Sequence, residues 1–446
     1  MSEINGSNSS TQTLPRAERR RQARAEMKKL QAADPRDVLE DEGFTALAHQ
    51  CGLVGLAKMM EEDVNNACGV RGKWEQNPQK RTGSRNGWEL GAVWIGGAWV
   101  QVERPRAVRV GGGEIELDSY RKAQNPEFLS RAVLTSTILG VSLRNHAKVV
   151  GAINPLPSEM KTSGLSKSAL GRRFIAAADS FLSTFLSRAL NERYLAVWLD
   201  AVAEGDYSVL AAIGLTADGT KKVLGLRQGA TETADFCAEF LEDLKSRGLS
   251  AKQGILWVVD GGAGTLKALR EVFGQDVLIQ RCRVHKRRNI VEKLTLPASE
   301  KERVANELEA VWAIQEPVLA GAKLELLARG LEANKHCAAA RSLREGLKEM
   351  LTCTRLGVPP GLIPSLTNTN VIESTFSVHE GVAHRVKRWR NGAQVQRWVA
   401  ASSARAEKAF ERVGDPELMA RLARALERHV SKCNAEPPRP ALALAS

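Results

Sequence analysis

Two short apolar runs, each ending in an aspartate, constrain the fold of this chain more than any other feature. The first run, YLAVWLD, ends at Asp200, and the second, GILWVVD, ends at Asp260. Nearly unbroken apolar runs of this length are typical of strands that are buried on both faces of a sheet. A carboxylate in such a run is costly to bury unless it lies at the strand end beside a cation. The sequence therefore predicts two core strands with acidic groups at their ends.

The segments between and after these runs predict an α/β fold with a mixed sheet. We expect strands at 207–215, 221–228 and 277–280, with helical segments at 236–244 and 265–273. In a β-β-β-α-β order the first and fourth strands can pair in parallel, which brings Asp200 and Asp260 to one edge of the sheet. Two carboxylates there need a cation, and Mg²⁺ with oxygen ligands is the natural choice. The alternative for either aspartate alone is that it simply ends its strand before a turn.

The charge balance predicts a polyanionic partner. Lys and Arg number 64 against 51 Asp and Glu, which gives a formal net charge of +13. The simplest partner for such a chain is nucleic acid. The seven cysteines form no Cys-x-x-Cys pair, which favours a reducing cytosol and no zinc finger. No apolar run has the length of a membrane span, so we expect a soluble, cytoplasmic protein with no membrane partner.

The N-terminal part predicts a basic arm, a helix and a small β module. We expect a disordered basic arm at 1–35, an amphipathic helix at 39–64, and a Gly- and Trp-rich stretch with a hairpin at Gly96-Gly97 at 72–117. Basic residues interleaved with aromatics can contact phosphates and stack on bases. The predicted DNA contacts of the module are Arg81, Arg85, Arg104 and Arg106. The alternative, expected for most of the tryptophans, is that they form the core of the module.

Residues 126–190 are strongly helical in pattern. Helices expected at 141–153 and 166–182 are separated by a connection that is longer than usual for a helix-turn-helix. Ser166 is a good N-cap for the second helix. Lys167, Arg172 and Arg173 in its first turns would then contact DNA. A plain helical hairpin that packs on the core is the competing interpretation.

Several motifs resemble bacterial transposases of the Mutator-type, insertion-sequence-256-like group. They run from Asp200 through VLGLRQGATETADF, FLEDLKSRGL and VVDGG to QRCRVHKRRN, and resume at TNTNVIES. The RTGSRNG run and the later RPR look like the N-terminal part of the same proteins. The resemblance implies a ribonuclease-H-like core with an Asp-Asp-Glu triad, here Asp200, Asp260 and Glu373. The sequence differs at GGAGT after Asp260, where the family often has a histidine.

The resemblance also implies the cofactor and the partners. The triad would hold two Mg²⁺ ions, with Mn²⁺ as an alternative, for phosphoryl transfer on DNA. The expected DNA partners are the terminal repeats of the element and the target DNA, bound by a homodimer or a larger assembly of this chain. The expected location of the protein is the bacterial cytoplasm, in association with the nucleoid. A helical insertion is expected between the second aspartate and the glutamate. The family's Cys-x-x-His signature is matched by Cys282 and His285.

Alternatives remain for several of these residues. Cys282 and His285 supply only two ligands, whereas a closed zinc site needs four, so we expect them to hydrogen-bond near the site. Glu373 fits a capping box that begins at Asn370, and Glu380 is a rival for its catalytic role. Further predicted DNA contacts are Lys286, Arg287, Arg288, Arg385, Lys387, Arg388 and Arg390.

The predicted architecture is a ribonuclease-H-like α/β core, interrupted by an all-α insertion and preceded by helical and small β DNA-binding modules. The expected divisions are 1–35, 36–125, 126–190, 191–289 (first part of the core), 290–365 (insertion), 366–410 (second part, with the Glu373 helix) and 411–446 (C-terminal helix and tail). The predicted function is DNA transposition. A domesticated DNA-binding regulator that retains the fold is the alternative. A ribonuclease H or repair nuclease is disfavoured by the insertion and by the amount of DNA-binding sequence.

Overall fold

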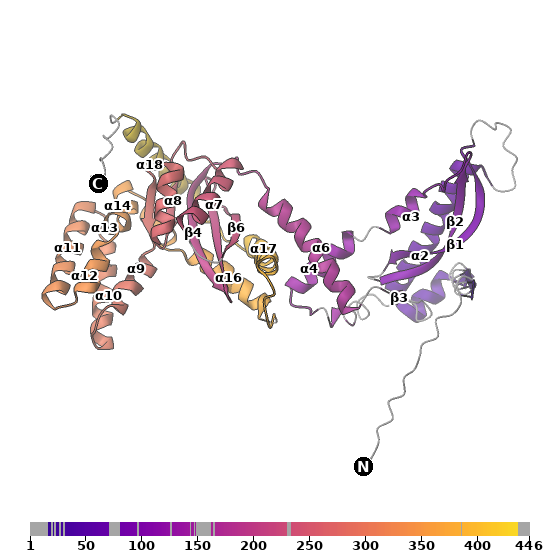
Figure 1. Cartoon of the computed structure of the whole chain (residues 1–446), viewed down its shortest axis with the longest axis horizontal. Helices are drawn as coiled ribbons and strands as arrows, with labels where there is room; N and C mark the ends of the chain where they lie inside the picture. The colour runs from indigo at the N-terminus through magenta and orange to yellow at the C-terminus, as the bar shows by residue number, and fades with distance from the viewer. Residues whose placement is uncertain are drawn as a thin grey trace, which may run out of the picture. The chain divides into compact units, whose positions relative to one another are not determined.

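The computed structural model describes most of the chain (Figure 1). The described residues are 32–70, 81–95, 98–124, 127–142, 162–163, 166–229, 233–384 and 386–435, with single positions or pairs between 17 and 29 and a few positions between 144 and 148. The chain divides into two units, Met1–Ala177 and Ala178–Ser446, which are described separately below. No described helix is long and apolar enough to cross a bilayer.

The first unit is built on a long helix and a β hairpin. Helix α2 (Pro35–Cys68) begins after Asp34, whose carboxylate accepts a hydrogen bond from the Arg36 amide at 2.8 Å. The other elements are β1 (Gly83–Ile95), β2 (Ala98–Arg109), α3 (Asp118–Ala123), α4 (Glu127–Ile138), β3 (Thr162–Ser163) and the start of α6 (Lys167–Leu186). Strands β1 and β2 are antiparallel, and β3 pairs with β2. The predicted helix and β module are therefore confirmed, while Gly96-Gly97 lies outside the described residues.

The expectation that most tryptophans form the core of this module is wrong for those that are described. The core is mainly aliphatic and joins Leu53 and Val64 of α2 to Val93 of β1. Side chains alternate between the two faces of a strand, so Trp94 points away from the face that Val93 packs against α2. Trp94 and Trp99 meet edge-to-face with ring centroids 5.7 Å apart, and both rings remain half-buried.

The second unit contains a five-stranded mixed sheet in the order β6-β5-β4-β7-β8. The strands are β4 (Tyr194–Glu204), β5 (Tyr207–Thr216), β6 (Lys221–Gly229), β7 (Leu256–Val259) and β8 (Leu278–Arg281). Strand β4 is antiparallel to β5 and parallel to β7, with Leu199 opposite Val259. Strand β8 extends the parallel side. The predicted strands and the predicted parallel pair are confirmed. The prediction that the first strand ends at Asp200 is wrong, because β4 continues to Glu204 in its antiparallel pairing with β5.

Helices cover both faces of this sheet (Figure 1). On one face Val197 and Leu199 pack with α7 (Ala234–Ser246) and α8 (Ala263–Phe273). On the other face Ala196 and Trp198 pack with α16 (Asn370–Ala383), α17 (Gly392–Lys408) and α18 (Pro416–Ala435). The alternation along β4 therefore decides which helices each side chain meets.

The segment between β8 and α16 is helical, as predicted for the insertion. Its elements are α9 (Arg283–Glu292), α10 (Ala298–Trp312), α11 (Pro317–Ala333), α12 (Cys337–Arg344), α13 (Leu347–Met350), α14 (Thr352–Leu356), the 3-10 helix η2 (Pro360–Leu362) and α15 (Ile363–Leu366). Helices α9 to α13 share a hydrophobic cluster of their own that contains Leu308, Trp312 and Leu324, whereas α14, η2 and α15 pack into the cluster on the α16 side of the sheet. Trp312 is therefore a core residue, as its apolar stripe predicted.

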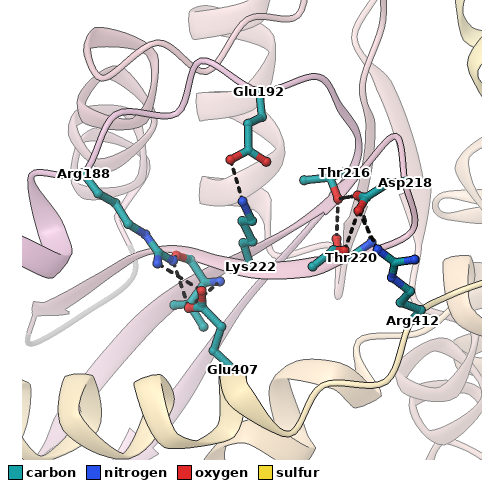
Figure 2. A network of polar contacts seen from close by, with 9 residues as sticks. Arg188, Glu192, Thr216, Asp218, Thr220, Lys222, Glu407 and Arg412 are labelled. Carbon is teal, nitrogen blue, oxygen red and sulfur yellow. Dashed lines mark hydrogen bonds and ion pairs between the residues drawn. The ribbon is translucent and has the colours of Figure 1, made fainter.

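Polar contacts fasten the C-terminal segment to strand β6 and to the turn before it (Figure 2). Glu407 of α17 pairs with both terminal nitrogens of Arg188, at 3.0 and 2.9 Å, and accepts a hydrogen bond from the Val223 amide at 3.2 Å. In the same view Arg412 reaches Asp218 at 3.1 Å. These contacts hold α17 along the edge strand of the sheet.

Replacing Glu407 by alanine is expected to lower the free energy of unfolding by about 1–2 kcal/mol. The change removes the carboxylate that the half-buried Arg188 guanidinium and the Val223 amide share, although the guanidinium keeps its hydrogen bond to the Val223 carbonyl. Hydrogen bonds to charged groups contribute about this much. Glu192→Ala is the matched control, because Glu192 is exposed and its pair with Lys222 at 2.5 Å is expected to contribute less than about 0.5 kcal/mol. Urea denaturation measures both, and equal losses would contradict this account of Glu407.

Candidate active site

The aspartates of the two apolar runs, Asp200 and Asp260, lie at neighbouring positions of a parallel strand pair. Asp200 is part of β4 and is buried, whereas Asp260 follows the last residue of β7 and is half-buried. Because Leu199 pairs with Val259 in parallel register, the residues after them are adjacent across the sheet. Trp198 and Val258, two residues earlier on each strand, pack on the α16 side. Both aspartates therefore face the helix that carries Glu373.

The surroundings of Asp200 disfavour its ionised form. Burial is the main cause, and the charge of Asp260 adds to it, while hydrogen bonds from Thr369 and from the Ala201 amide act in the opposite direction. Together these effects raise the pKa of Asp200 to about 6. Asp260 accepts a hydrogen bond from the Gly262 amide at 2.9 Å, which fixes its side chain against the turn before α8. A nearby cation would relieve the repulsion between these two carboxylates.

Glu373 lies in the first turn of α16, but it does not cap that helix. The N-cap is Thr369, and the Asn370 amide donates to Asn368 Oδ1 at 2.9 Å. The capping-box interpretation of Glu373 is therefore wrong, because the helix begins one residue earlier than that pattern requires. Instead, Glu373 Oε1 lies 3.5 Å from His285 Nε2. The rival Glu380 acts electrostatically on the buried His379 further along the same helix.

His285 connects the glutamate to the two aspartates. Cys282 is the N-cap of α9, and its sulfur accepts a hydrogen bond from the His285 amide at 3.5 Å. Thr369 Oγ1 lies 3.5 Å from His285 Nδ1. A hydrogen bond between the imidazole and the Cys282 side chain is the main cause that raises the pKa of His285. The charges of Cys282, Asp200 and Asp260 add to it, and together these effects outweigh burial and raise the pKa to about 9. Cys282 and His285 thus hydrogen-bond beside the predicted site, as expected, and the imidazole is protonated at neutral pH.

The carboxylates fit a hard divalent cation in part. Asp200 and Asp260 supply adjacent oxygen donors, which is the ligand type that Mg²⁺ prefers. In the part of the chain that the structure describes, no three His, Cys, Asp or Glu side chains are close enough together to hold a metal ion. Glu373 pairs with His285 instead, and its side chain is 46% exposed. The pair of aspartates fits the ion, and Glu373 as third ligand stays a prediction.

Comparison with known proteins decides the family. The model of the family described as "Transposase, Mutator family" matches residues 22–412. The chain belongs to this family. Among its relatives, the transposase for insertion sequence element ISRM5 of Rhizobium meliloti (strain 1021) is 28% identical over 71% of this chain and 77% of its own length. The transposase for insertion sequence element IS256 in transposon Tn4001 of Staphylococcus aureus is 25% identical over 68% and 76%.

A third relative is more similar over a shorter region. The transposase for insertion sequence element IST2 of Acidithiobacillus ferrooxidans is 31% identical over 41% of this chain. The match spans 58% of the length of that relative. This member of the Mutator family is thus related to insertion-sequence transposases of several bacteria.

Several of the side chains predicted to contact DNA pair with other groups of the protein instead. Lys286 is buried and pairs with Glu345, so it is not available to a phosphate. Arg85 lies 2.7 Å from Glu61, and the Arg81 guanidinium donates to the Cys68 carbonyl at 2.8 Å. The partners of Arg104 and Arg106 are Glu89 and Glu114, at 3.0 to 3.5 Å. Sequence patterns could not show these pairs, because most of the acidic partners are distant in the chain.

Other predicted contacts keep exposed side chains. This group comprises Lys167, Arg172, Arg288, Lys387, Arg388 and Arg390. Arg287 is half-buried and lies 3.8 Å from Glu309, and Arg385 lies outside the described residues. The Arg173 guanidinium stacks over the rings of Trp94 and Trp99, at 4.9 and 5.9 Å from their centroids.

The helix-turn-helix prediction is tested only in its second half. Helix α6 (Lys167–Leu186) forms as expected, and Ser166 Oγ accepts a hydrogen bond from the Ala169 amide at 3.2 Å. Most of the first predicted helix, 141–153, lies outside the described residues, and the described positions 141, 142, 144 and 145 are not helical. In the connection between them, Thr162 and Ser163 pair with β2. The connection therefore adds a short strand to the β module.

Proposed function

We propose that this chain binds the DNA ends of its insertion sequence and catalyses Mg²⁺-dependent strand cleavage and strand transfer. The observation that supports the proposal most is the adjacency of Asp200 and Asp260 on two parallel strands, Asp200 within β4 and Asp260 directly after β7, facing the Glu373 helix. A strand order of three antiparallel strands followed by two parallel ones fits a ribonuclease-H-like core. Family membership supplies the expectation that the partner is DNA.

In this proposal each polar side chain has a distinct task. Asp200 and Asp260 would hold the cations, with Glu373, which pairs with His285, as the third ligand. When bound, two Mg²⁺ ions supply activation of the attacking oxygen and stabilisation of the leaving oxygen in an in-line phosphoryl transfer. Thr369 holds Asp200 and His285 in place through its hydroxyl. The contact between His285 Nε2 and Glu373 Oε1 at 3.5 Å keeps that carboxylate near the aspartates.

The direct test is a cleavage assay on duplexes that carry the ends of the encoding element. We expect strand cleavage in Mg²⁺ or Mn²⁺ and none in excess chelator. Cleavage that persists in chelator would contradict the metal-dependent mechanism. Tight binding to the ends without any cleavage would favour a DNA-binding regulator that retains the fold.

Arg172→Gln is expected to weaken binding to terminal DNA and to flatten its salt dependence. Arg172 is exposed near the start of α6, and each phosphate contact contributes a slope of about −0.9 in a plot of log K against log salt. Arg173→Gln is the matched control, because its guanidinium stacks on Trp94 and Trp99 and should affect the stability of the module instead. Fluorescence anisotropy at several salt concentrations measures the slope. A slope unchanged by Arg172→Gln would favour the plain helical hairpin.

A further inference from the structure

A buried arginine holds the main chain at Asp260. Arg281 is the last residue of β8 and pairs in register with Val259, the residue before Asp260. Its side chain is 4% exposed. The guanidinium Nε donates a hydrogen bond to the Asp260 carbonyl at 3.2 Å. The Asp260 carboxylate accepts a hydrogen bond from the Gly262 amide. Hydrogen bonds therefore hold both the main chain and the side chain of Asp260 in place.

Two glycines make room for this guanidinium. A Cβ atom at Gly261 would lie 1.7 Å from Arg281 Nε, and one at Gly346 would lie 2.9 Å from Arg281 Nη1. Both glycines have positive φ angles, of +98° and +77°, which other residues rarely adopt. The guanidinium is thus held between the turn that follows Asp260 and the residue that follows Glu345.

Glu345 connects this arginine to the helical segment. Its carboxylate accepts hydrogen bonds from Arg281 Nη1 at 2.8 Å and from Nη2 at 3.5 Å, and it also forms an ion pair with the buried Lys286. Burial alone would raise the pKa of Glu345, but the hydrogen bonds from Arg281 and Lys286 lower it overall. Glu345 is the C-cap residue of α12, so the contact joins the helical segment to the turn at Asp260.

We propose that Arg281 is a positioning residue that sets the Asp260 turn for cation binding, and that Glu345 holds Arg281 in place from the helical segment. The inference rests on the proposed function, in which Asp260 is a metal ligand. A guanidinium is suited to this position because its planar group of N–H donors can bind the Asp260 carbonyl and the Glu345 carboxylate at the same time. Partners that orient metal ligands typically contribute a factor of roughly 10–100 to metal affinity.

The test compares Arg281→Lys and Glu345→Gln with Glu349→Gln. Glu349 pairs with Arg270 at 3.1 Å, so this control removes an ion pair between α8 and α13 without touching Asp260. Mn²⁺ is titrated into each full-length protein, and binding is followed by calorimetry and by the rise in unfolding temperature. We expect Mn²⁺ affinity to fall about tenfold in both test variants and to stay unchanged in Glu349→Gln.

Two further measurements separate positioning from stability. The unfolding temperature of each variant in chelator reports any structural loss, and terminal DNA binding should stay at the parental level in all three. Parental Mn²⁺ affinity in both Arg281→Lys and Glu345→Gln would overturn the inference and leave the proposed function standing. Mn²⁺ affinity that is unchanged in Asp260→Asn would overturn both the inference about Arg281 and the proposed function, because Asp260 would then not be a metal ligand.

Discussion

Asp260→Asn is expected to abolish strand cleavage and joining while leaving DNA binding intact. The substitution keeps the size of the side chain but removes the charge that a hard cation requires. Metal ions contribute several kcal/mol of transition-state stabilisation to such reactions, which corresponds to a loss of about 10³-fold or more. Affinity for DNA should survive, because it comes from Lys and Arg side chains elsewhere. A gel shift and a cleavage assay on the same preparation measure both properties.

The fold of this variant should be at least as stable as that of the parent. The charge of Asp260 is one cause of the raised pKa of Asp200, so its removal relieves like-charge repulsion in the metal-free protein. Thermal unfolding in chelator checks this expectation. Full cleavage activity in Asp260→Asn would contradict the assignment of Asp260 as a metal ligand. A large loss of stability in this variant would mean that its loss of cleavage reflects unfolding.

Trp198→Ala is expected to lower the free energy of unfolding by about 3–5 kcal/mol. Trp198 is 1% exposed in the middle of β4, and its indole Nε1 donates to the Ser365 carbonyl at 3.1 Å. Large-to-small changes at such positions leave a cavity that the surroundings fill only in part. Domains are stable by about 5–15 kcal/mol, so this variant should be close to unfolding. Guanidinium denaturation measures the loss.

Two milder substitutions test whether the hydrogen bond to Ser365 contributes. Trp257 on β7 is also fully buried, but its indole nitrogen has no hydrogen-bond partner among the described residues. Trp198→Phe should therefore cost about 1 kcal/mol more than Trp257→Phe. Equal losses of unfolding free energy in the two variants would mean that the hydrogen bond between Trp198 and Ser365 does not stabilise the packing of α15 against β4.

Local pattern was sufficient to predict the sheet. The apolar runs ending at Asp200 and Asp260 are long enough to be strands and short enough not to be helices, and their order permits only a few arrangements. The parallel pairing that brings the two aspartates together followed from that order. The family resemblance then pointed to Glu373, Cys282 and His285. In the structure the Thr369 hydroxyl contacts both Cys282 and His285, and His285 contacts Glu373.

Contacts between distant segments were not predictable in this way. Lys286 reads as a surface cation in a basic run, but it is buried because Glu345, far along the chain, neutralises it. Arg281 was missed for the same reason, although a charged residue at the end of an apolar strand was a usable signal. The cap of α16 was placed one residue too late, because Asn370 and Thr369 are both acceptable N-cap residues.

A crystal structure of the full chain soaked in Mn²⁺ tests the central claim most directly. We predict an anomalous peak between Asp200 and Asp260, with carboxylate oxygens about 2.0–2.2 Å from the metal, and with Glu373 turned from His285 to complete the site. Without metal, Glu373 should stay 3.5 Å from His285. A fully occupied Mn²⁺ site elsewhere, with Asp200 and Asp260 carrying no peak, would contradict the assignment of these carboxylates to catalysis.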